Sequence, residues 1–162
     1  MTRWLPAVTL LAATLAGCAA PPPPPPPTVV NLSLSTSADV NPTVDNQPAP
    51  LALRVYQLAA AANFNAAEFY PLYNADAATL KADLVNRQDF LLAPGQSKSL
   101  TFKPDANVKA VAVFAAYRDF QHATWRASTD LEPNKVNVIT LTAGHDGVTL
   151  KAMTLPSAPA AP

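Results

Sequence analysis

The stretch VNLSLST, residues 30–36, alternates apolar and polar side chains along its whole length. Successive side chains of a strand point to opposite faces, so a period of two predicts a strand with one buried face. The stretch LALRVYQL, residues 51–58, repeats the pattern, with Arg54 and Tyr56 on its second face. The apolar positions that define the buried face are Val30, Leu32 and Leu34 in the first stretch and Leu51, Leu53 and Val55 in the second.

Four further segments have strand character. Residues 89–102 contain Pro94-Gly95, which suits the centre of a type II turn and predicts a hairpin. Residues 108–117 are apolar on both faces, which is typical of a central strand. Residues 134–142 and 147–153 predict a last pair of strands around a Gly-His-Asp-Gly turn.

A short helical segment interrupts this pattern after residue 58. Asn65 is followed three positions later by a glutamate, which predicts a helix start, and Pro71 is expected to end that turn early. Asp76 can cap a second helix in which Leu80 and Leu84 share one face.

Six or seven strands with a small helical insertion predict a mainly β protein, an antiparallel β-sandwich. We expect the sandwich to span residues 29–155, with the helical insertion at about residues 65–85. The Pro- and Ala-rich residues 156–162 are expected to form a disordered tail.

The chain has 162 residues, with 11 Lys and Arg balanced by 11 Asp and Glu. This balance gives no electrostatic reason to expect a nucleic-acid partner. The single cysteine excludes an internal disulfide or a CxxC motif, so apolar burial must stabilise the domain.

Residues 1–17 have the composition of a secretory signal peptide, with Arg3 before an apolar run and small residues at its end. The alternative is a membrane-spanning helix, but a span needs about 20 apolar residues and this run stops at Cys18. Leu15-Ala16-Gly17-Cys18 resembles the lipobox of bacterial lipoproteins, whereas a free thiol would be a liability in an oxidising compartment.

The lipobox resemblance implies a diacylglycerol thioether and an N-acyl chain on Cys18, with no other cofactor. Ala19 stands where an aspartate would signal retention in the inner membrane, so we expect anchoring at the periplasmic face of the outer membrane. The seven prolines of residues 21–27 form a stiff spacer of about 20 Å within the predicted linker 18–28. A PxxP ligand for an aromatic groove is the competing interpretation of this run.

Candidate catalytic residues are few. His122 and His145 lie outside any known catalytic motif, and each sits beside an aspartate in a predicted turn. The pairs Asp119–His122 and His145–Asp146 could converge on a metal, but no third ligand is marked. Arg118, Trp125 and Arg126 are interpreted as structural residues, the Trp as a core anchor. We therefore expect no enzyme activity.

The remaining exposed feature is residues 38–50, which carry three prolines and no apolar period. A connection of this length is uncommon in a compact domain and is often a binding loop, although a tolerated surface connection is the simpler alternative.

Several segments resemble one family by their order and spacing over residues 29–148. They are the lipobox, residues 30–58, AAEFYPLY (66–73), LKADL (80–84), LLAPG (91–95) and AVFAAYRDF (112–120) followed by Trp125-Arg126. Together they resemble the TssJ family, also called VasD or SciN, the outer-membrane lipoproteins of type VI secretion systems. The resemblance implies a transthyretin-like sandwich with a helical insertion.

The resemblance also implies a partner, the periplasmic C-terminal region of the inner-membrane subunit TssM, contacted by the loop between the first two strands. Asn46-Gln47 departs from the glycine-containing turn of many members. A periplasmic lipoprotein that binds a small ligand or a glycan remains the alternative. The loop residues matched by position are Asp39, Val40, Asn41, Pro42, Thr43, Val44, Asp45, Asn46, Gln47 and Pro48.

Overall fold

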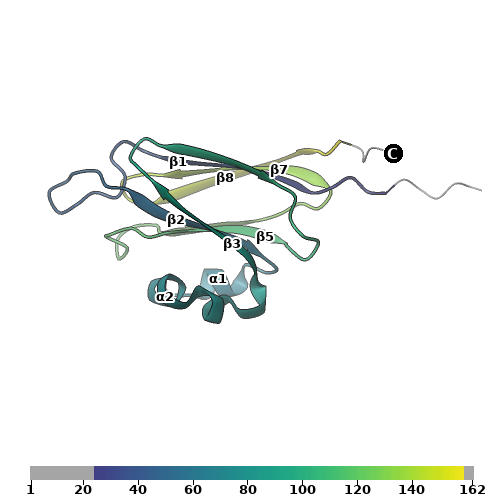
Figure 1. Ribbon diagram of the computed structural model, residues 1–162, viewed down its shortest axis with the longest axis horizontal. Helices are drawn as coiled ribbons and strands as arrows, with labels where there is room; N and C mark the ends of the chain where they lie inside the picture. Colours follow the sequence, from purple (N-terminus) through teal and green to yellow (C-terminus); the bar gives the residue numbers. More distant parts are fainter. Residues whose placement is uncertain (1–23, 159–162) are drawn as a thin grey trace, which may run out of the picture.

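The computed structural model describes residues 24–158, in which eight strands form two facing sheets (Figure 1). The sheets have the strand orders β4-β1-β7-β8 and β3-β2-β5-β6. The elements in chain order are β1 (Val29–Thr36), β2 (Leu51–Leu58), α1 (Ala62–Ala66), α2 (Phe69–Leu80), the 3-10 turn η1 (Lys81–Asp83), β3 (Leu84–Leu92), β4 (Ser97–Phe102), β5 (Ala110–Ala115), β6 (Arg126–Asp130), β7 (Lys135–Ala143) and β8 (Val148–Pro156).

The main core lies between the two sheets. Leu32 and Leu34 of β1 face Leu53 of β2 within one cluster of buried side chains, as the period of two predicts. Burying each such side chain contributes about 1.5–3 kcal/mol. Every residue of β5 is buried: Val111 and Val113 face this core, while the alternate residues face the helices, which confirms a central strand.

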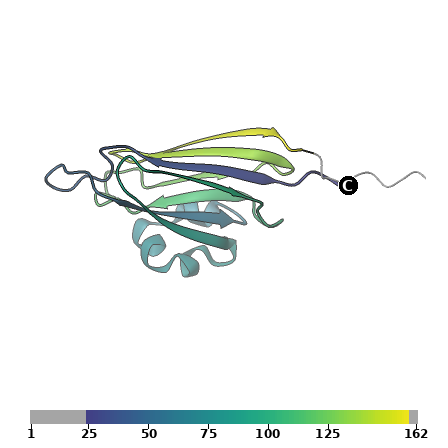
Figure 2. The same cartoon turned by 45° about the horizontal axis from the view of Figure 1, so that its top comes forward.

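The helical insertion covers the outer face of the β3-β2-β5-β6 sheet (Figures 1 and 2). Tyr56 and Leu58 of β2 are fully buried there against Phe64 of α1 and Leu72 of α2. The insertion therefore builds a second core on the side of the sheet that would otherwise face water.

The insertion begins and ends earlier than predicted. Asn65 lies inside α1 and caps no helix, and α2 continues through Pro71. Pro71 is the third residue of α2, where its missing N–H would have no helical partner in any case. Leu80 is the last residue of α2 and Leu84 opens β3, so the predicted shared helical face is wrong. Lys81, with φ 54°, turns the chain between them.

Asp76 does stand at a helical start, because the non-helical Ala75 (φ −150°, ψ 49°) divides α2 in two. One carboxylate oxygen accepts a hydrogen bond from the backbone N–H of Ala77 at 2.8 Å. The other accepts from the Tyr56 hydroxyl at 2.9 Å and from Arg87 at 2.8 Å. Burial alone would raise the pKa of Asp76, but the bonds from Arg87 and Tyr56 outweigh it and hold the pKa below its ordinary value.

The predicted hairpin at residues 89–102 is wrong, although its turn is present. Gly95 has φ +74°, and the N–H of Gln96 donates to the carbonyl of Ala93 at 3.1 Å. This turn links the two sheets, since β3 pairs with β2 and β4 pairs with β1. The Thr36 hydroxyl donates to the Ala93 carbonyl at 2.7 Å and fixes the corner to the end of β1.

The remaining strands refine the predicted sandwich. The mainly β sandwich is confirmed, but its β1–β7 pair is parallel while the other strand pairs among residues 24–158 are antiparallel. The last hairpin is confirmed as β7–β8, and β8 continues to Pro156, one residue into the predicted tail. β6 was missed, since its sequence RASTD is polar and marks no buried face.

The chain enters and leaves the sandwich at one end. The Ser157 hydroxyl donates to the carbonyl of Pro27 at 2.8 Å, so the segments at both limits of the described chain lie together. We call this the entry end. The β1–β2 loop, residues 37–50, projects from the opposite end, which we call the loop end (Figures 1 and 2). No helix within residues 24–158 is both long and apolar enough for a membrane span.

Candidate functional site

The β1–β2 loop is an ordered structure with a buried base. The side chain of Val40 is fully buried in the core between the sheets. The N–H of Ala49 donates to the Val40 carbonyl at 3.1 Å and closes the loop above it. The sequence had placed Val40 among exposed contact residues, whereas the structure makes it the hydrophobic anchor of the loop.

Asn41 holds the loop to the rest of the domain. It is buried and adopts φ 49°, a left-handed conformation that Asn tolerates better than most residues. Its side-chain amide donates to the carbonyl of Pro50 at 2.9 Å and accepts from the backbone N–H of Arg118 at 2.8 Å. These bonds join both strands of the loop to the β5–β6 connection. Asn41 therefore holds the base of the loop in place.

The loop tip is a hydrogen-bonded turn. The N–H of Thr43 donates to the Gln47 carbonyl at 2.8 Å, and the N–H of Asn46 donates to the Thr43 carbonyl at 2.9 Å. Asn46 has φ 59°, so it supplies the left-handed residue for which glycine is the usual choice. The turn raises Val44 into solvent with 96% of its surface exposed.

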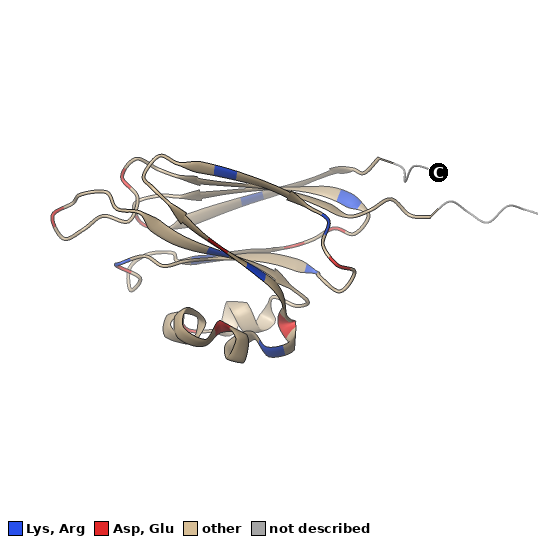
Figure 3. Ribbon diagram, in the orientation of Figure 1, with Lys and Arg blue, Asp and Glu red and all other residues tan. Residues whose placement is uncertain are grey.

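Charged residues are dispersed over the described part of the domain (Figure 3). At the loop, the hydroxyl of Ser37 donates to the Asp39 carboxylate at 2.5 Å. This bond, together with the nearby charge of His145, lowers the pKa of Asp39. Asp39 is thus ionised at neutral pH and belongs to the stem of the loop.

Both histidines lie beside the loop base. His122, Asp119, His145 and Asp146 line a small cavity of about 60 Å³ together with Asn41, Pro42, Tyr117 and Ala123. Each imidazole bonds its own aspartate, His122 to Asp119 at 2.8 Å and His145 to Asp146. No set of three or more His, Cys, Asp or Glu side chains within residues 24–158 is arranged to hold a metal.

Tyr117 separates this cavity from the core. Its hydroxyl donates to the carbonyl of Gly144 at 2.9 Å, and burial raises the pKa of the phenol, which stays protonated. The β7–β8 turn that contains Gly144 is thereby tied to the β5–β6 connection. The hydrogen bonds of Asn41 and Tyr117 therefore join the loop base, the β5–β6 connection and the β7–β8 turn into one rigid assembly.

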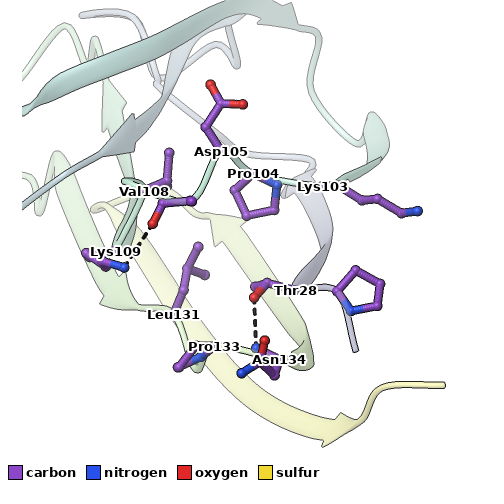
Figure 4. Close-up of a pocket in the computed structure, with 11 residues that line it drawn as sticks. Thr28, Lys103, Pro104, Asp105, Val108, Lys109, Leu131, Pro133 and Asn134 are labelled. Carbon is purple, nitrogen blue, oxygen red and sulfur yellow. Dashed lines mark hydrogen bonds between the residues drawn. The ribbon is translucent and has the colours of Figure 1, made fainter. Parts of the chain in front are cut away.

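A larger cavity of about 350 Å³ lies at the entry end (Figure 4). Pro27, Pro104, Pro133, Val108 and Leu131 make much of its wall. Two polar groups of its lining are already paired within the protein. The ammonium group of Lys109 donates to the carbonyl of Ala106 at 2.9 Å, and the N–H of Asn134 donates to the Thr28 hydroxyl at 2.8 Å.

Of the three residues interpreted as structural, Trp125 and Arg126 do hold the core together, whereas the Arg118 side chain is exposed and lies in neither core cluster. Trp125 packs edge-on against Phe69 and Phe114 at 5.3 and 5.6 Å between ring centres. The Arg126 guanidinium lies 4.6 Å from the Trp125 ring centre and donates to the carbonyls of Phe64 and Ala67. Both side chains fasten the helical insertion to the sheet.

The structure divides the predicted contact residues into three groups. Val40 and Asn41 form the buried base, and Asp39 lies on the stem. The other seven, residues 42–48, make the outer part of the loop. Cys18, the signal peptide and the first three prolines of the run, residues 21–23, lie outside the described residues. Sequence reasoning missed exposed Tyr70 and Tyr73 of α2, whose only signal was their place beside Phe69.

A rigid sandwich that presents one ordered, exposed loop at its end has the architecture of a binding module. The family model that matches residues 28–146 is described as Type VI secretion lipoprotein, VasD, EvfM, TssJ. The chain belongs to this family of secretion-system lipoproteins, which is not known for enzyme activity. The family resemblance drawn from the sequence is thus confirmed.

Solved structures agree. The T6SS lipoprotein TssJ1 from Pseudomonas aeruginosa matches with a TM-score of 0.76 and 33% identity, covering 81% of this chain and 100% of that chain. Serratia marcescens Lip, a membrane-bound component of the type VI secretion system, matches with a TM-score of 0.71 and 28% identity, covering 77% and 96%. A chain of the structure described as the TssM C-terminal domain from EAEC matches with a TM-score of 0.62 and 23% identity over 76% and 97%, which shows the fold alone. No curated protein sequence matches the chain.

Proposed function

We propose that this protein is the outer-membrane lipoprotein of a type VI secretion membrane complex, and that its β1–β2 loop binds the periplasmic C-terminal region of TssM. Residues 1–17 are the cleaved signal peptide, and acyl chains on Cys18 hold the domain at the periplasmic face of the outer membrane. Residues 18–28 are the spacer. The protein then bridges the two membranes without performing catalysis.

The observation that carries this proposal is the position of an ordered loop at the end of the sandwich opposite to chain entry (Figure 1). A proline spacer of about 20 Å and an eight-residue strand of about 26 Å separate the lipid from this loop. A domain tethered through its entry end therefore points residues 42–48 away from the outer membrane.

The order of the loop favours a binding role. Its base is anchored by Val40 and Asn41, and its tip is closed by backbone hydrogen bonds. A partner that binds such a loop loses little free energy in ordering it. Since two charged groups, Asp39 and Asp45, lie in the loop and Val44 caps it, the contact combines apolar and acidic groups.

The choice of partner rests on the family and on the TssJ relatives described above. Chains of this fold also occur in structures described as the TssM C-terminal domain and as a type VI membrane complex. These descriptions belong to those proteins. They motivate the use of the TssM periplasmic C-terminal region as the probe.

The test measures binding of that TssM region to residues 18–162 carrying Cys18→Ser, which keeps the protein soluble. Because Val40 and Asn41 are buried, only residues 43–47 are replaced with a Gly-Ser linker of equal length. We expect loss of binding with an unchanged fold by circular dichroism. The matched control replaces residues 104–107 at the entry end. Undiminished binding by the loop variant would defeat the loop assignment.

A further inference from the structure

Exposed apolar side chains gather at the loop end of the domain. Six large hydrophobic side chains of the described residues are strongly exposed, and four of them lie in the loop or on the helix-covered face near it. Met153 and Leu155, near the end of β8, lie toward the entry end. The four at the loop end, with the exposed fraction of each, are Val44 (96%), Leu91 (70%), Tyr70 (58%) and Tyr73 (45%).

The two tyrosines are held rigidly by a stack of aromatic rings. Phe69 stacks on Phe120 with 4.2 Å between ring centres and on Tyr73 with 5.8 Å. Tyr70 packs edge-on against both Phe69 and Phe120, at 5.6 and 5.1 Å. The Arg54 guanidinium also lies over the Tyr73 ring, 5.5 Å from its centre. Rigid aromatic side chains lose little entropy when a partner covers them.

These rings are contiguous with the loop. Tyr70, Tyr73, Phe120, Arg118 and Asn41 contribute to the lining of a shallow groove of about 350 Å³. Asn41 holds the loop base, and its side-chain oxygen accepts a hydrogen bond from the backbone N–H of Arg118. We call Tyr70, Tyr73, Arg118 and Phe120 the aromatic face. A partner that covers the loop and extends past its base meets this face next.

The loop alone is too small for a stable interface. A specific interface takes about 20 residues from each side, and the segment 39–50 has only 12 positions, of which Val40 and Asn41 are buried. About half of the contact surface must therefore come from neighbouring elements. The aromatic face is contiguous with the loop base through Asn41 and has the composition of a binding hot spot, rich in Tyr and Arg.

The aromatic face also has unused polar groups. Within residues 24–158, the Arg118 guanidinium forms no ion pair or side-chain hydrogen bond, and the hydroxyls of Tyr70 and Tyr73 form no hydrogen bond. A guanidinium pairs best with a carboxylate, and phenol groups donate to peptide carbonyls. These groups specify the chemistry of the segment that fits the groove.

We propose that the partner-binding surface extends from the β1–β2 loop across Arg118 to Tyr70 and Tyr73, so that the helical insertion is a second docking element. The occupant is a segment of the same partner that presents a carboxylate to Arg118 and apolar side chains to the tyrosine rings. This inference rests on the proposed function, because it assigns both surfaces to one protein.

The test uses the soluble Cys18→Ser protein and the TssM periplasmic C-terminal region as probe. Tyr70→Ala combined with Tyr73→Ala is expected to weaken the Kd at least about 30-fold, as truncation of hot-spot aromatic residues does. Arg118→Glu is expected to lower the association rate about tenfold at low salt, with a smaller effect at high salt. Met153→Ala combined with Leu155→Ala removes two exposed hydrophobic residues at the entry end and should leave Kd unchanged.

Thermal melting of the tyrosine variant shows whether weaker binding comes from lost contacts or from an unfolded protein. Arg118→Glu provides an independent readout, because the Arg118 side chain packs in no core cluster. Undiminished binding by both variants, with binding lost in the loop variant, would overturn the extended surface and leave the proposed function intact. Undiminished binding by the loop variant would instead defeat the assignment of the β1–β2 loop in the proposed function.

A third arm sediments the same variants with isolated peptidoglycan sacculi. The proposal expects no difference between the tyrosine variant and the parent protein in this assay. Loss of sacculus binding with unchanged binding of the TssM region would overturn the proposal and assign the aromatic face to a glycan.

Discussion

The two ends of the sandwich both expose apolar side chains and both contain a cavity, yet they differ in how the surrounding backbone is held. At the loop end, Asn41, Tyr117 and the stacked ring of Phe69 bind several connections into one rigid surface. At the entry end, side-chain bonds of Ser157 and Thr28 also tie chain segments together, but within residues 24–158 no aromatic stack holds the exposed Met153 and Leu155. Exposure alone does not mark a binding surface; a fixed arrangement of exposed groups does.

The largest effect that distinguishes the two ends is expected from Cys18→Ser in the full-length protein. This change removes the lipid anchor on the entry side and leaves the loop end unchanged. Without the acyl chains the domain should fold normally but leave the membrane fraction, since durable attachment needs two or more chains. We expect loss of secretion in cells together with unchanged binding of the TssM region in vitro. Wild-type secretion by this variant would show that anchoring is dispensable.

The loop end also depends on the ion pairs that hold the helical insertion. Asp76→Ala removes the carboxylate shared by Arg54 and Arg87 and leaves the buried Tyr56 hydroxyl without its acceptor. Because removing one partner of a buried ionic group is costly, we expect a loss of about 3 kcal/mol, or roughly 10 °C in Tm.

Asp89→Ala is the matched control, since Asp89 pairs with the same two arginines but is half exposed. It should cost less than about 1 kcal/mol. The lowered pKa of Asp76 sets the direction of a pH effect: its contribution is present above the ordinary carboxyl pKa and is lost as pH falls through the folded value. Equal losses in both variants would contradict the assigned role of burial.

The loop tip offers a smaller and purely local change. Val44→Asp should leave Tm unchanged, because Val44 is almost fully exposed and packs on nothing. If the tip enters an apolar site on the partner, the buried charge should weaken the Kd about tenfold or more. Met153→Asp is the matched control, because it places the same charge at an exposed apolar position of the entry end. A similar loss of affinity in this control would point to a general effect of charge.

Local sequence patterns predicted the strands well but not their partners. The alternation of β1 and β2 and the apolar β5 follow from burial of one or both faces. The Pro94-Gly95 turn was also predicted, yet turn chemistry is local and cannot say whether the next strand stays in the same sheet. The polar β6 was missed because its face is covered by the distant helical insertion.

For the candidate site, the sequence likewise predicted the position of the loop but not its contacts with distant segments. Proline content and missing periodicity marked the loop, but the burial of Val40 and Asn41 depends on contacts with distant segments. The aromatic face joins side chains from α2 and the β5–β6 connection, which are separated by about 45 to 50 positions in the sequence. No short motif could mark such a surface.

A weaker effect is expected from pH at the loop base. The hydrogen bond and charge of Asp146 raise the pKa of His145, and the charge of Asp39 adds to this. The stabilising pair is therefore complete below the ordinary His pKa of about 6.5 and is lost as pH rises through the folded value. An NMR titration should give a lower pKa for His145 in Asp146→Asn than in the parent, whereas an unchanged value would exclude this pairing in solution.

The smallest effect is expected at Asn46, the left-handed residue of the loop tip. Asn46→Gly removes the residual cost of a left-handed side-chain residue but increases the freedom of the unfolded chain, so the two changes offset each other within about 0.5 kcal/mol. Asn46→Val cannot adopt φ 59° without strain and should cost about 1–2 kcal/mol, accompanied by weaker partner binding as the tip loses its turn. Chemical denaturation and Kd measured on both variants test this directly. If glycine and valine behaved alike, the left-handed turn would not be what holds Val44 at the tip, and the rigidity that distinguishes the loop end would have to come from its base alone.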